Sequence, residues 1–241
     1  MTRWIDPSPI QIPASFADIN LPPLIAQTLV RRGIRDAASA RAFLHPDLLP
    51  STSFPGIEKA AEYIFLATRT DQPICVWGDF DVDGQTSTTL LVQTLQAIGA
   101  NVTYYIPIRG KESHGVHIET LKPIIDNGAK LIVTCDTGIS AHEAVDYANS
   151  RGVDVIVTDH HDLGETLPNA KTIVNPKLLS KDHLLANLAG VGVAYKLAEV
   201  LIGNWGAGNG KRESSPNSQS PTLDSLLDLV ALGLIADVAL L

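Results

Sequence analysis

The chain has 241 residues, of which 45% are hydrophobic, and it carries a formal net charge of −8. This length and apolar content allow a sizeable core in one large domain or two small ones, and they exclude a largely disordered chain. The negative charge argues against a protein that coats nucleic acid by general electrostatics, although a local basic groove could still bind a phosphate chain.

The sequence lacks the patterns of secretion and membrane insertion. No stretch reaches the roughly 18 uninterrupted apolar residues of a membrane span, and the first residues lack the apolar segment of a signal peptide. The two cysteines, Cys75 and Cys135, each lie inside an apolar run, which is typical of buried thiols and not of a disulfide framework or a thiolate metal site. We therefore expect a cytoplasmic protein without a membrane segment.

Residues 1–70 are expected to form an irregular arm followed by a small helical segment. The first twenty or so residues are rich in proline, serine and aspartate, which disfavour regular structure. The apolar periodicity that follows predicts helices at 21–32, 36–44 and 57–68.

From Ile74 onward, short apolar runs alternate with helical patterns, which is the signature of βαβ units and a parallel sheet. The predicted strands cover residues 74–79, 102–106, 131–135, 154–158 and 171–174. The predicted helices cover 86–98, 117–127, 140–150, 190–202 and 223–234. Residues 204–222 have loop composition and are expected to be a disordered insertion. The sequence thus predicts an α/β fold over residues 71–241, with a parallel sheet and flanking helices, preceded by the small helical segment.

Three aspartates, Asp79, Asp81 and Asp83, stand at alternate positions directly after the first predicted strand. If the strand continues through them, their carboxylates share one face at spacings of about 7 Å. Like charges at that spacing repel unless a cation lies among them. Hard divalent cations prefer carboxylate oxygen, so the segment predicts a metal site at the end of the strand, with an acidic surface turn as the alternative.

The residues after the aspartates offer contacts to an anion. Gly84 allows a tight turn, and Ser87 belongs to a Ser/Thr run whose hydroxyls could bind a phosphate or could simply cap a helix. Gly190-Val191-Gly192 before a predicted helix is likewise compatible with a phosphate-cradling turn or with tight helix packing.

Polar residues also follow the other predicted strands. They are Arg109 and His114 after the second strand, Asp136 after the third, Asp159-His160-His161 after the fourth, and Asp237 at the end of the last apolar run. In open parallel sheets, ligands bind outside the carboxyl ends of the strands, so these groups should converge on one edge. Adjacent side chains on extended backbone point in opposite directions, so one imidazole can bind metal while the other reaches a phosphate or a water.

Aspartates combined with a histidine give a mixed oxygen and nitrogen ligand set without thiolate, which suits Mn²⁺ or Mg²⁺ better than structural Zn²⁺. Carboxylates that can bridge allow two ions about 3.5–4 Å apart, the arrangement that hydrolyses phosphoesters. From the residues alone we expect a metal-dependent phosphodiesterase. Arg109 and His114 could neutralise a phosphate, or they could belong to a solvated loop.

These motifs resemble those of the DHH phosphoesterases, and within them the RecJ-type single-stranded-DNA-specific exonucleases. Asp159-His160-His161 matches the motif that names the family, while residues 78–87, 133–138 and 232–238 are similar to its first, second and fourth motifs. The resemblance extends to segments 32–34, 42–46, 105–109, 174–177 and 190–197. It therefore covers most of the chain from about residue 21 onward.

The resemblance implies a role for each motif residue. Asp79, Asp81 and Asp136 would bind one metal ion, and the second ion would be bound by Asp83, Asp136, His160 and Asp237. His161 would approach the scissile phosphate, with Asp159 orienting the histidines. Arg109 and His114 would contact phosphate groups. The implied cofactors are two divalent cations, Mn²⁺ or Mg²⁺.

The resemblance also implies a reaction, the 5′→3′ removal of nucleotides from the 5′ end of single-stranded DNA during repair and recombination, with other repair proteins as further partners. Two positions depart from the family pattern, since Ile108 replaces an asparagine and His114 replaces an aromatic residue. Family members continue into a DHHA1-like domain and often an oligonucleotide-binding (OB) domain. We expect both to be absent from a chain that ends at Leu241.

Two other functions stay open. One is a DHH phosphodiesterase of short oligonucleotides or cyclic dinucleotides, against which the helical segment and the RecJ-like segments argue. The other is a truncated, catalytically weak nucleic-acid-binding or scaffold protein. The complete set of expected metal ligands favours the enzyme over the scaffold.

Overall fold

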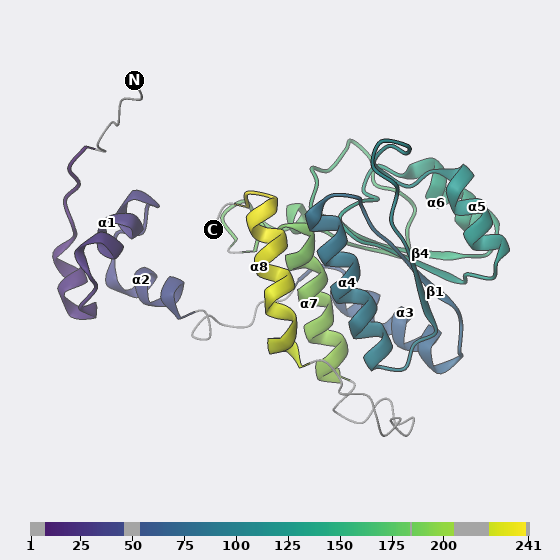
Figure 1. The fold of residues 1–241 in the computed structure, drawn as a ribbon, viewed down its shortest axis with the longest axis horizontal. Coiled ribbons are helices and arrows are strands. Elements are labelled where there is room, and N and C mark those ends of the chain that lie inside the picture. Colours follow the sequence, from purple (N-terminus) through teal and green to yellow (C-terminus); the bar gives the residue numbers. More distant parts are fainter. Residues whose placement is uncertain (1–7, 46–53, 184, 205–221, 240–241) are drawn as a thin grey trace. The chain divides into compact units, whose positions relative to one another are not determined.

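The computed structural model describes residues 8–45, 54–183, 185–204 and 222–239 (Figure 1). The chain divides into two compact units, Met1–Ser53 and Phe54–Leu241. Most of the insertion expected at 204–222 lies outside the described residues.

The boundary between the units precedes helix α3 (Ile57–Arg69), which the sequence analysis had grouped with the N-terminal segment. The apolar face of α3, including Ile57, Ile64 and Phe65, belongs to the main core of the second unit. An amphipathic helix must bury its apolar face against some other element, and here that element is the sheet. The expected boundary at residues 70/71 therefore differs from the division in the structure.

The first unit is helical, as the sequence predicts. It contains the 3-10 helix η1 (Ala14–Ile19), within the expected arm, and the helices α1 (Pro23–Arg31) and α2 (Ala37–Leu44). Asp36 is the N-cap of α2, because its Oδ1 accepts a hydrogen bond from the Ser39 N–H at 2.8 Å. A small core of Phe16, Ala26, Leu29, Val30 and Ala40 stabilises this unit.

The described residues of the second unit form a five-stranded sheet in which all neighbouring strands are parallel. The strands are β1 (Ile74–Trp77), β2 (Val102–Tyr105), β3 (Leu131–Thr134), β4 (Asp154–Thr158) and β5 (Thr172–Val174). Their order is β2-β1-β3-β4-β5. The order reverses between β1 and β3, which is the switch point where ligands bind in open α/β sheets. The predicted α/β class is confirmed.

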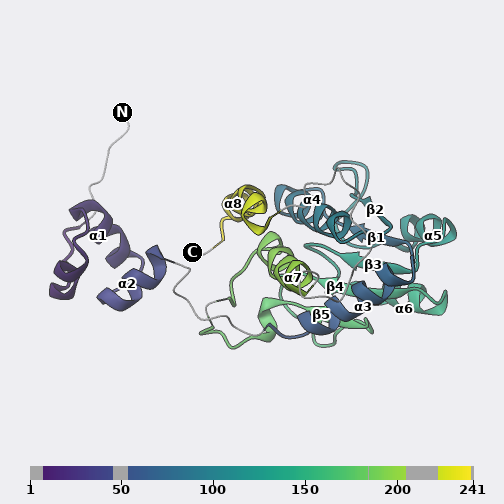
Figure 2. The ribbon, with the colours of Figure 1, turned by 90° about the horizontal axis from the view of Figure 1, so that it is seen from below.

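Helices cover both faces of the sheet (Figure 2). Besides α3, the described helices of this unit include α4 (Val82–Ala97), α5 (Ile118–Asp126), α6 (His142–Ser150), α7 (Gly190–Asn204) and α8 (Leu227–Ala236). Helices α3, α4 and α7 pack on one face, α5 and α6 on the other, and α8 packs against α4 and α7 (Figure 1). Among the described helices, none is long and apolar enough to span a bilayer.

Both faces of the central strands β1, β3 and β4 are buried, which explains their continuous apolar runs, whereas the edge strand β2 is partly exposed. In β1, Ile74 and Val76 join the core under α4 and α7, while Cys75 and Trp77 join the core under α5 and α6. Cys75 and Cys135 are free buried thiols, as expected.

The acidic segment after β1 is not a continuation of the strand. The strand ends at Trp77, and α4 begins at Val82 and not at residue 86. Asp81 is the N-cap of α4, because its Oδ1 accepts a hydrogen bond from the Gly84 N–H at 2.9 Å. Asp83 consequently lies in the first helical turn. The three aspartates therefore share an edge of the sheet and not one face of a strand, since the preference of aspartate for the N-cap overrides the alternating pattern.

Candidate metal centre

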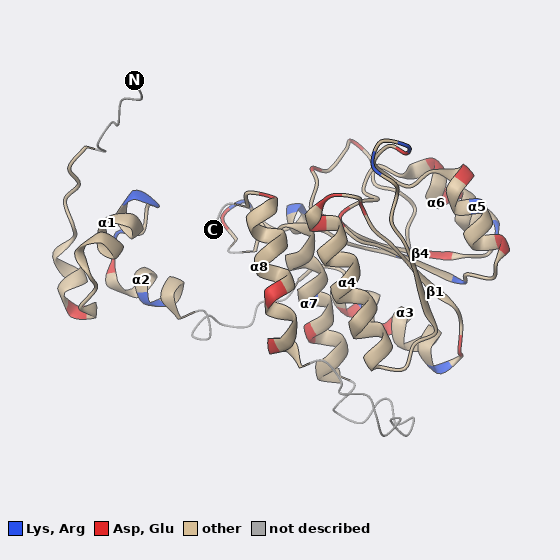
Figure 3. Cartoon of the chain, viewed as in Figure 1, with Lys and Arg blue, Asp and Glu red and all other residues tan. Residues whose placement is uncertain are grey.

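The carboxyl edge of the sheet gathers the acidic and histidine residues that follow β1, β3 and β4. Figure 3 shows acidic residues where α4 begins, on the same side of the sheet as a loop between β2 and α5 with basic residues at its tip. Four of the carboxylates are almost completely buried, because Asp79, Asp83, Asp136 and Asp159 are 3%, 2%, 2% and 1% exposed. Buried carboxylates are costly unless hydrogen bonds or cations compensate their charge.

His160 lies at the centre of this cluster. Its Nε2 is 2.9 Å from Asp136 Oδ1 and 3.7 Å from Asp83 Oδ2, and its Nδ1 is 4.0 Å from Asp237 Oδ2. Donor atoms of Asp83, His160 and Asp237 lie within 4.8 Å of one another, as do those of Asp136, His160 and His161. The structure thus brings together four of the six predicted metal ligands, from β3, β4, α4 and the end of α8.

The surroundings of Asp136 Oδ1 indicate whether a cation fits this cluster. The atom is buried, yet no described group directs a hydrogen bond at it, although His160 Nε2 is only 2.9 Å away. A ring nitrogen and a carboxylate oxygen that face each other without a well-directed hydrogen bond are arranged like two ligands of one ion. The residues therefore fit a hard or borderline divalent cation bound by oxygen and imidazole nitrogen.

The pKa shifts of these residues also favour a bound cation. Burial raises the pKa of Asp136 to about 7, with a further contribution from the charge of Asp83. Burial also raises the pKa of Asp83, although backbone N–H groups and His160 oppose the change. For His160, burial lowers the pKa, but the adjacent Asp136 carboxylate outweighs burial, so its pKa is raised. A bound cation would relieve the repulsion between the carboxylates.

Asp83 joins the metal cluster to the start of α7. Its Oδ2 accepts a hydrogen bond from the Gly190 N–H at 2.6 Å, and its Oδ1 accepts one from the Val191 N–H at 2.8 Å. A Cβ atom at Gly190 would lie 2.7 Å from Asp136 Cβ, and one at Gly233 would lie 2.9 Å from Asp83 Oδ1. Both glycines therefore let a helix approach the cluster closely. Of the two interpretations of Gly190, tight helix packing agrees with these contacts better than a phosphate-cradling turn.

Asp159 is hydrogen-bonded to His161, and its orienting role stays a prediction. Its Oδ1 accepts hydrogen bonds from His161 Nδ1 and the His160 N–H, both at 2.7 Å, and its Oδ2 accepts one from the Ile139 N–H at 2.8 Å. Burial raises the pKa of Asp159, but these hydrogen bonds outweigh burial and lower it overall. The hydrogen bond that His161 donates to Asp159 raises the pKa of His161 to about 9. The His161 side chain is 58% exposed, so Nε2 is the ring nitrogen left for a ligand.

Asp79 and Asp81 have other partners in the structure. Asp79 Oδ2 lies 2.7 Å from His114 Nδ1, and Asp81 caps α4. Among the described residues, neither joins the two groups of candidate ligand atoms given above. Their assignment to a metal ion stays a prediction.

Gly84 and Ser87 serve the packing of α4. A Cβ atom at Gly84 would lie 2.6 Å from the Asp79 carbonyl oxygen, so only glycine allows the helix to begin this close to β1. Ser87 is 0% exposed, and its hydroxyl donates a hydrogen bond to the Asp83 carbonyl at 2.6 Å. Because both positions face the interior, this packing does not support the expected substrate contacts, which stay a prediction.

Phe80 is a residue whose role the sequence analysis missed. The Arg109 guanidinium lies over its ring at 4.6 Å from the centroid, and the His114 ring packs beside it at 4.1 Å between centroids. Glu112 shapes the same loop, since its carboxylate accepts hydrogen bonds from the Tyr105 hydroxyl at 2.5 Å and the Ile108 N–H at 2.7 Å. Phe80 thus positions Arg109 and His114 at the rim of the centre. Its place between Asp79 and Asp81 was the available signal.

Comparison with known proteins agrees with the motifs. The family model "DHH family, N-terminal domain" matches residues 73–234. The chain is 39% identical over 241 residues to the single-stranded-DNA-specific exonuclease RecJ of Bacillus subtilis (strain 168), covering 98% of this chain and 28% of that protein. It is 41% identical over 222 residues to RecJ of Escherichia coli (strain K12), covering 90% of this chain and 37% of that protein. The chain spans well under half the length of these relatives.

Solved RecJ structures share the fold. RecJ from Thermus thermophilus in complex with Mn²⁺ has a TM-score of 0.73 and 32% identity, covering 93% of this chain and 30% of that one. Another exonuclease RecJ bound to manganese has a TM-score of 0.66 and 36% identity, covering 79% of this chain and 45% of that one. A further Thermus thermophilus RecJ structure is a complex with Mg²⁺. The metals in these structures are the predicted cofactors, Mn²⁺ and Mg²⁺. The chain belongs to the DHH family, whose N-terminal domain matches residues 73–234.

Proposed function

We propose that this chain is the catalytic N-terminal part of a metal-dependent exonuclease that removes nucleotides from the 5′ end of single-stranded DNA in cytoplasmic repair and recombination. The observation that carries the proposal is the buried cluster around His160, in which Asp136 Oδ1 lies 2.9 Å from Nε2 without a directed hydrogen bond. The names of the relatives, single-stranded-DNA-specific exonucleases, support the substrate.

The ligand set divides between two ions in the proposed enzyme. Asp83, Asp136, His160 and Asp237 would hold one ion, and Asp79, Asp81 and Asp136 would hold the other. Bound Mn²⁺ or Mg²⁺ would supply Lewis-acid stabilisation of the phosphate oxygens and a more acidic water.

The other residues would bind and orient the substrate. Asp159 occupies Nδ1 of His161, which leaves Nε2 to contact an oxygen of the scissile phosphate. Arg109, held over the Phe80 ring, would offset the charge of a neighbouring phosphate. Asp159 would act as a positioning residue, because its two carboxylate oxygens accept hydrogen bonds from His161 Nδ1 and from three backbone N–H groups.

The test is release of nucleotides from single-stranded DNA labelled at either the 5′ or the 3′ end, with Mn²⁺ or with EDTA. We expect mononucleotides from the 5′ end in Mn²⁺, and none from the Asp136→Asn variant. Asparagine is chosen because Asp136 has a φ of 59°, which asparagine tolerates. Asp146→Asn, at an exposed position on α6, is the matched control.

Three outcomes would contradict the proposal. Full activity of Asp136→Asn would show that hydrolysis does not depend on the proposed metal centre. Hydrolysis restricted to dinucleotides or cyclic dinucleotides would favour the small-substrate phosphodiesterase. Binding of single-stranded DNA without turnover in any divalent metal would favour the scaffold protein.

A further inference from the structure

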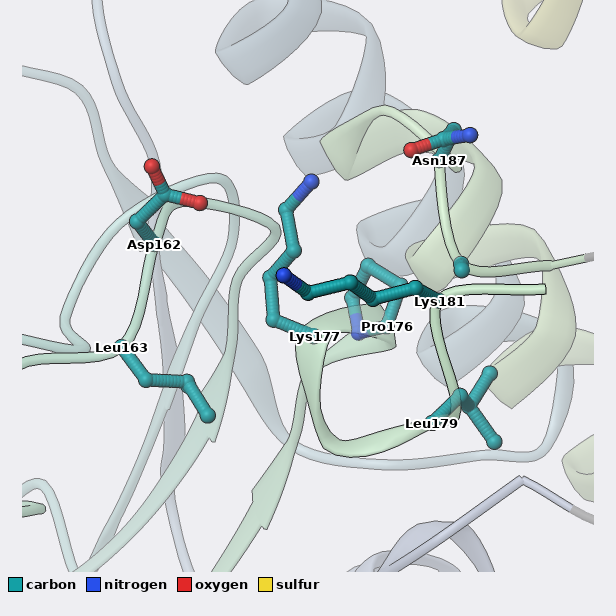
Figure 4. A pocket seen from close by; sticks show the side chains of 8 residues that line it. Asp162, Leu163, Pro176, Lys177, Leu179, Lys181 and Asn187 are labelled. Carbon is teal, nitrogen blue, oxygen red and sulfur yellow. The ribbon is translucent and has the colours of Figure 1, made fainter. Parts of the chain in front are cut away.

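A pocket of about 600 Å³ lies beside the metal centre, between the segment that follows His161 and the turn that follows β5 (Figure 4). We propose that this pocket, lined by Asp162, Leu163, Pro176, Lys177, Leu179, Lys181, Ala186 and Asn187, is a subsite for one nucleotide unit of a single-stranded nucleic acid. The inference rests on the proposed function and extends it, because it places part of the strand away from the reacting phosphate.

Two lysines supply the positive charge of the pocket. The side chains of Lys177 and Lys181 enter the space between Asp162 and Asn187 from different directions (Figure 4). Both residues are exposed, and within the described part of the chain neither ammonium group forms an ion pair, even with Asp162. Two unpaired ammonium groups facing one carboxylate leave a net positive pocket, which suits the single charge of a phosphodiester.

The remaining lining suits a base or sugar. Leu163, Pro176 and Leu179 supply apolar surface, and Asn187 adds an amide that can donate and accept hydrogen bonds. A pocket of about 300–1,000 Å³ with an apolar lining and a few polar groups is typical of small-molecule and cofactor sites. An inorganic phosphate would use the lysines but would leave the apolar surface in water. The lining therefore fits a nucleotide better than a free phosphate.

Asn175 connects the pocket to the metal centre. Its side chain is fully buried, with Nδ2 donating to the His161 carbonyl at 3.0 Å and Oδ1 accepting from the Lys177 N–H at 2.8 Å. One amide thus fixes the lysine-bearing 3-10 turn η3 (Pro176–Leu178) against the backbone of the histidine that faces the scissile phosphate. On the other side, Asn187 precedes Gly190, whose N–H binds Asp83. A strand with one phosphate at His161 would have a neighbouring unit within reach of the pocket.

The experiment measures binding of a fluorescent thymidine oligonucleotide to the purified chain in EDTA, so that hydrolysis plays no part. The test variant is Lys177→Gln/Lys181→Gln. The control is Lys59→Gln/Lys130→Gln, which changes the net charge equally at exposed positions on α3 and before the amino end of β3. Each phosphate contact on a single strand contributes about 0.7 to the slope of log affinity against log salt. Because the subsite would hold one phosphate, we expect the test variant to lose about tenfold in affinity and about 0.7 in slope, and the control to lose little of either.

Four results would overturn the subsite. They are unchanged binding by the test variant, equal losses in the test and control variants, an absence of salt-dependent binding by the parent chain, and displacement of the oligonucleotide by inorganic phosphate at the same concentration as by thymidine monophosphate. As a check on the apolar surface, Leu163→Ala should reduce the preference for thymidine over abasic oligonucleotide. Because binding is measured without metal and does not depend on turnover, failure of the proposed hydrolysis and failure of the subsite are separate results.

Discussion

Replacement of Gly190 by alanine is the most direct test of how the metal centre is assembled. A Cβ atom at this position would lie 2.7 Å from Asp136 Cβ, 2.9 Å from Asp136 Oδ1 and 2.9 Å from Asp83 Oδ2, where ordinary contact begins at 3.4 Å. The differences, 3.4 − 2.7 = 0.7 Å and 3.4 − 2.9 = 0.5 Å, must be met by movement of α7 or of the two aspartates. Either movement changes the positions of buried ligand atoms that lie in separate elements.

The expected cost has two parts. Overpacking of a buried contact lowers the free energy of unfolding by about 1–3 kcal/mol. Loss of the groups that orient metal ligands typically lowers metal affinity by about 10–100-fold, and displaced ligand atoms should cost a similar amount. We therefore expect Gly190→Ala to fold with a normal far-ultraviolet circular dichroism spectrum and to bind Mn²⁺ at least about tenfold more weakly, measured by electron paramagnetic resonance.

Gly203→Ala is the matched control, because Gly203 lies in the same helix and a Cβ atom there would meet nothing within 4 Å. Alanine replaces glycine in a helix with a gain of about 0.5–1 kcal/mol, so this variant should be slightly more stable in urea and should bind Mn²⁺ normally. Mn²⁺ affinity of Gly190→Ala within about twofold of the parent would refute the reasoning, since it would mean that α7 can retreat without disturbing either ligand.

Three further predictions concern residues around the centre. Asn175→Ala should lower the free energy of unfolding by about 2–3 kcal/mol in urea, because two buried hydrogen bonds lose a partner, whereas exposed Asn187→Ala should change it by less than about 0.5 kcal/mol. In EDTA, Asp136→Asn should unfold at a higher urea concentration than the parent, because a buried carboxylate is removed from a cluster of like charges. It should also lose the stabilisation that Mn²⁺ gives the parent. Equal stabilisation of both proteins by Mn²⁺ would exclude Asp136 as a ligand. Burial and the hydrogen bond to Glu112 raise the pKa of Tyr105 to about 12, so its ultraviolet titration should have that midpoint in the parent and a lower one in Glu112→Gln. The hydrogen bonds from Tyr105 and Ile108 lower the pKa of Glu112, so the stability that this carboxylate contributes is present above its ordinary pKa and is lost as the pH falls through the lowered value.

Most of the strands could be predicted because the centre of a parallel sheet, buried on both faces, requires continuous apolar runs. All five lie within the predicted ranges, from Ile74–Trp77 to Thr172–Val174. The sequence wrongly suggested that the strand could continue from Asp79 to Asp83, because alternating polar residues suit a strand and a capped helix start equally well. The grouping of α3 failed for another reason, since periodicity gives the apolar face of a helix but not the surface that this face covers.

The candidate ligands could be predicted because parallel strands deliver the residues after them to one edge. Asp136 and His160 came together for that reason, 2.9 Å apart in the structure. Gly190 and Asn175 could not be given their roles from sequence, because each acts through a partner in another element. Gly190 donates to a carboxylate 107 positions earlier, and no local pattern encodes such a contact. Phe80 lay inside a recognised motif, but its contacts with Arg109 and His114 depend on how a distant loop folds back.

Helix α8 packs against α4 and α7 on one side, contacts the metal centre at two places, and exposes its other side to solvent. Gly233 packs against Asp83, and Asp237 at the end of the helix reaches His160, while Leu232, Ile235 and Val238 are 53%, 74% and 83% exposed. A cation bound to Asp83, His160 and Asp237 would therefore be thermodynamically linked to docking of the helix. At a metal concentration 100 times the dissociation constant, this linkage amounts to about 2.7 kcal/mol. Amide hydrogen exchange in α8 would then slow by about 100-fold when metal binds, so the last helix would report occupancy of the centre without any substrate.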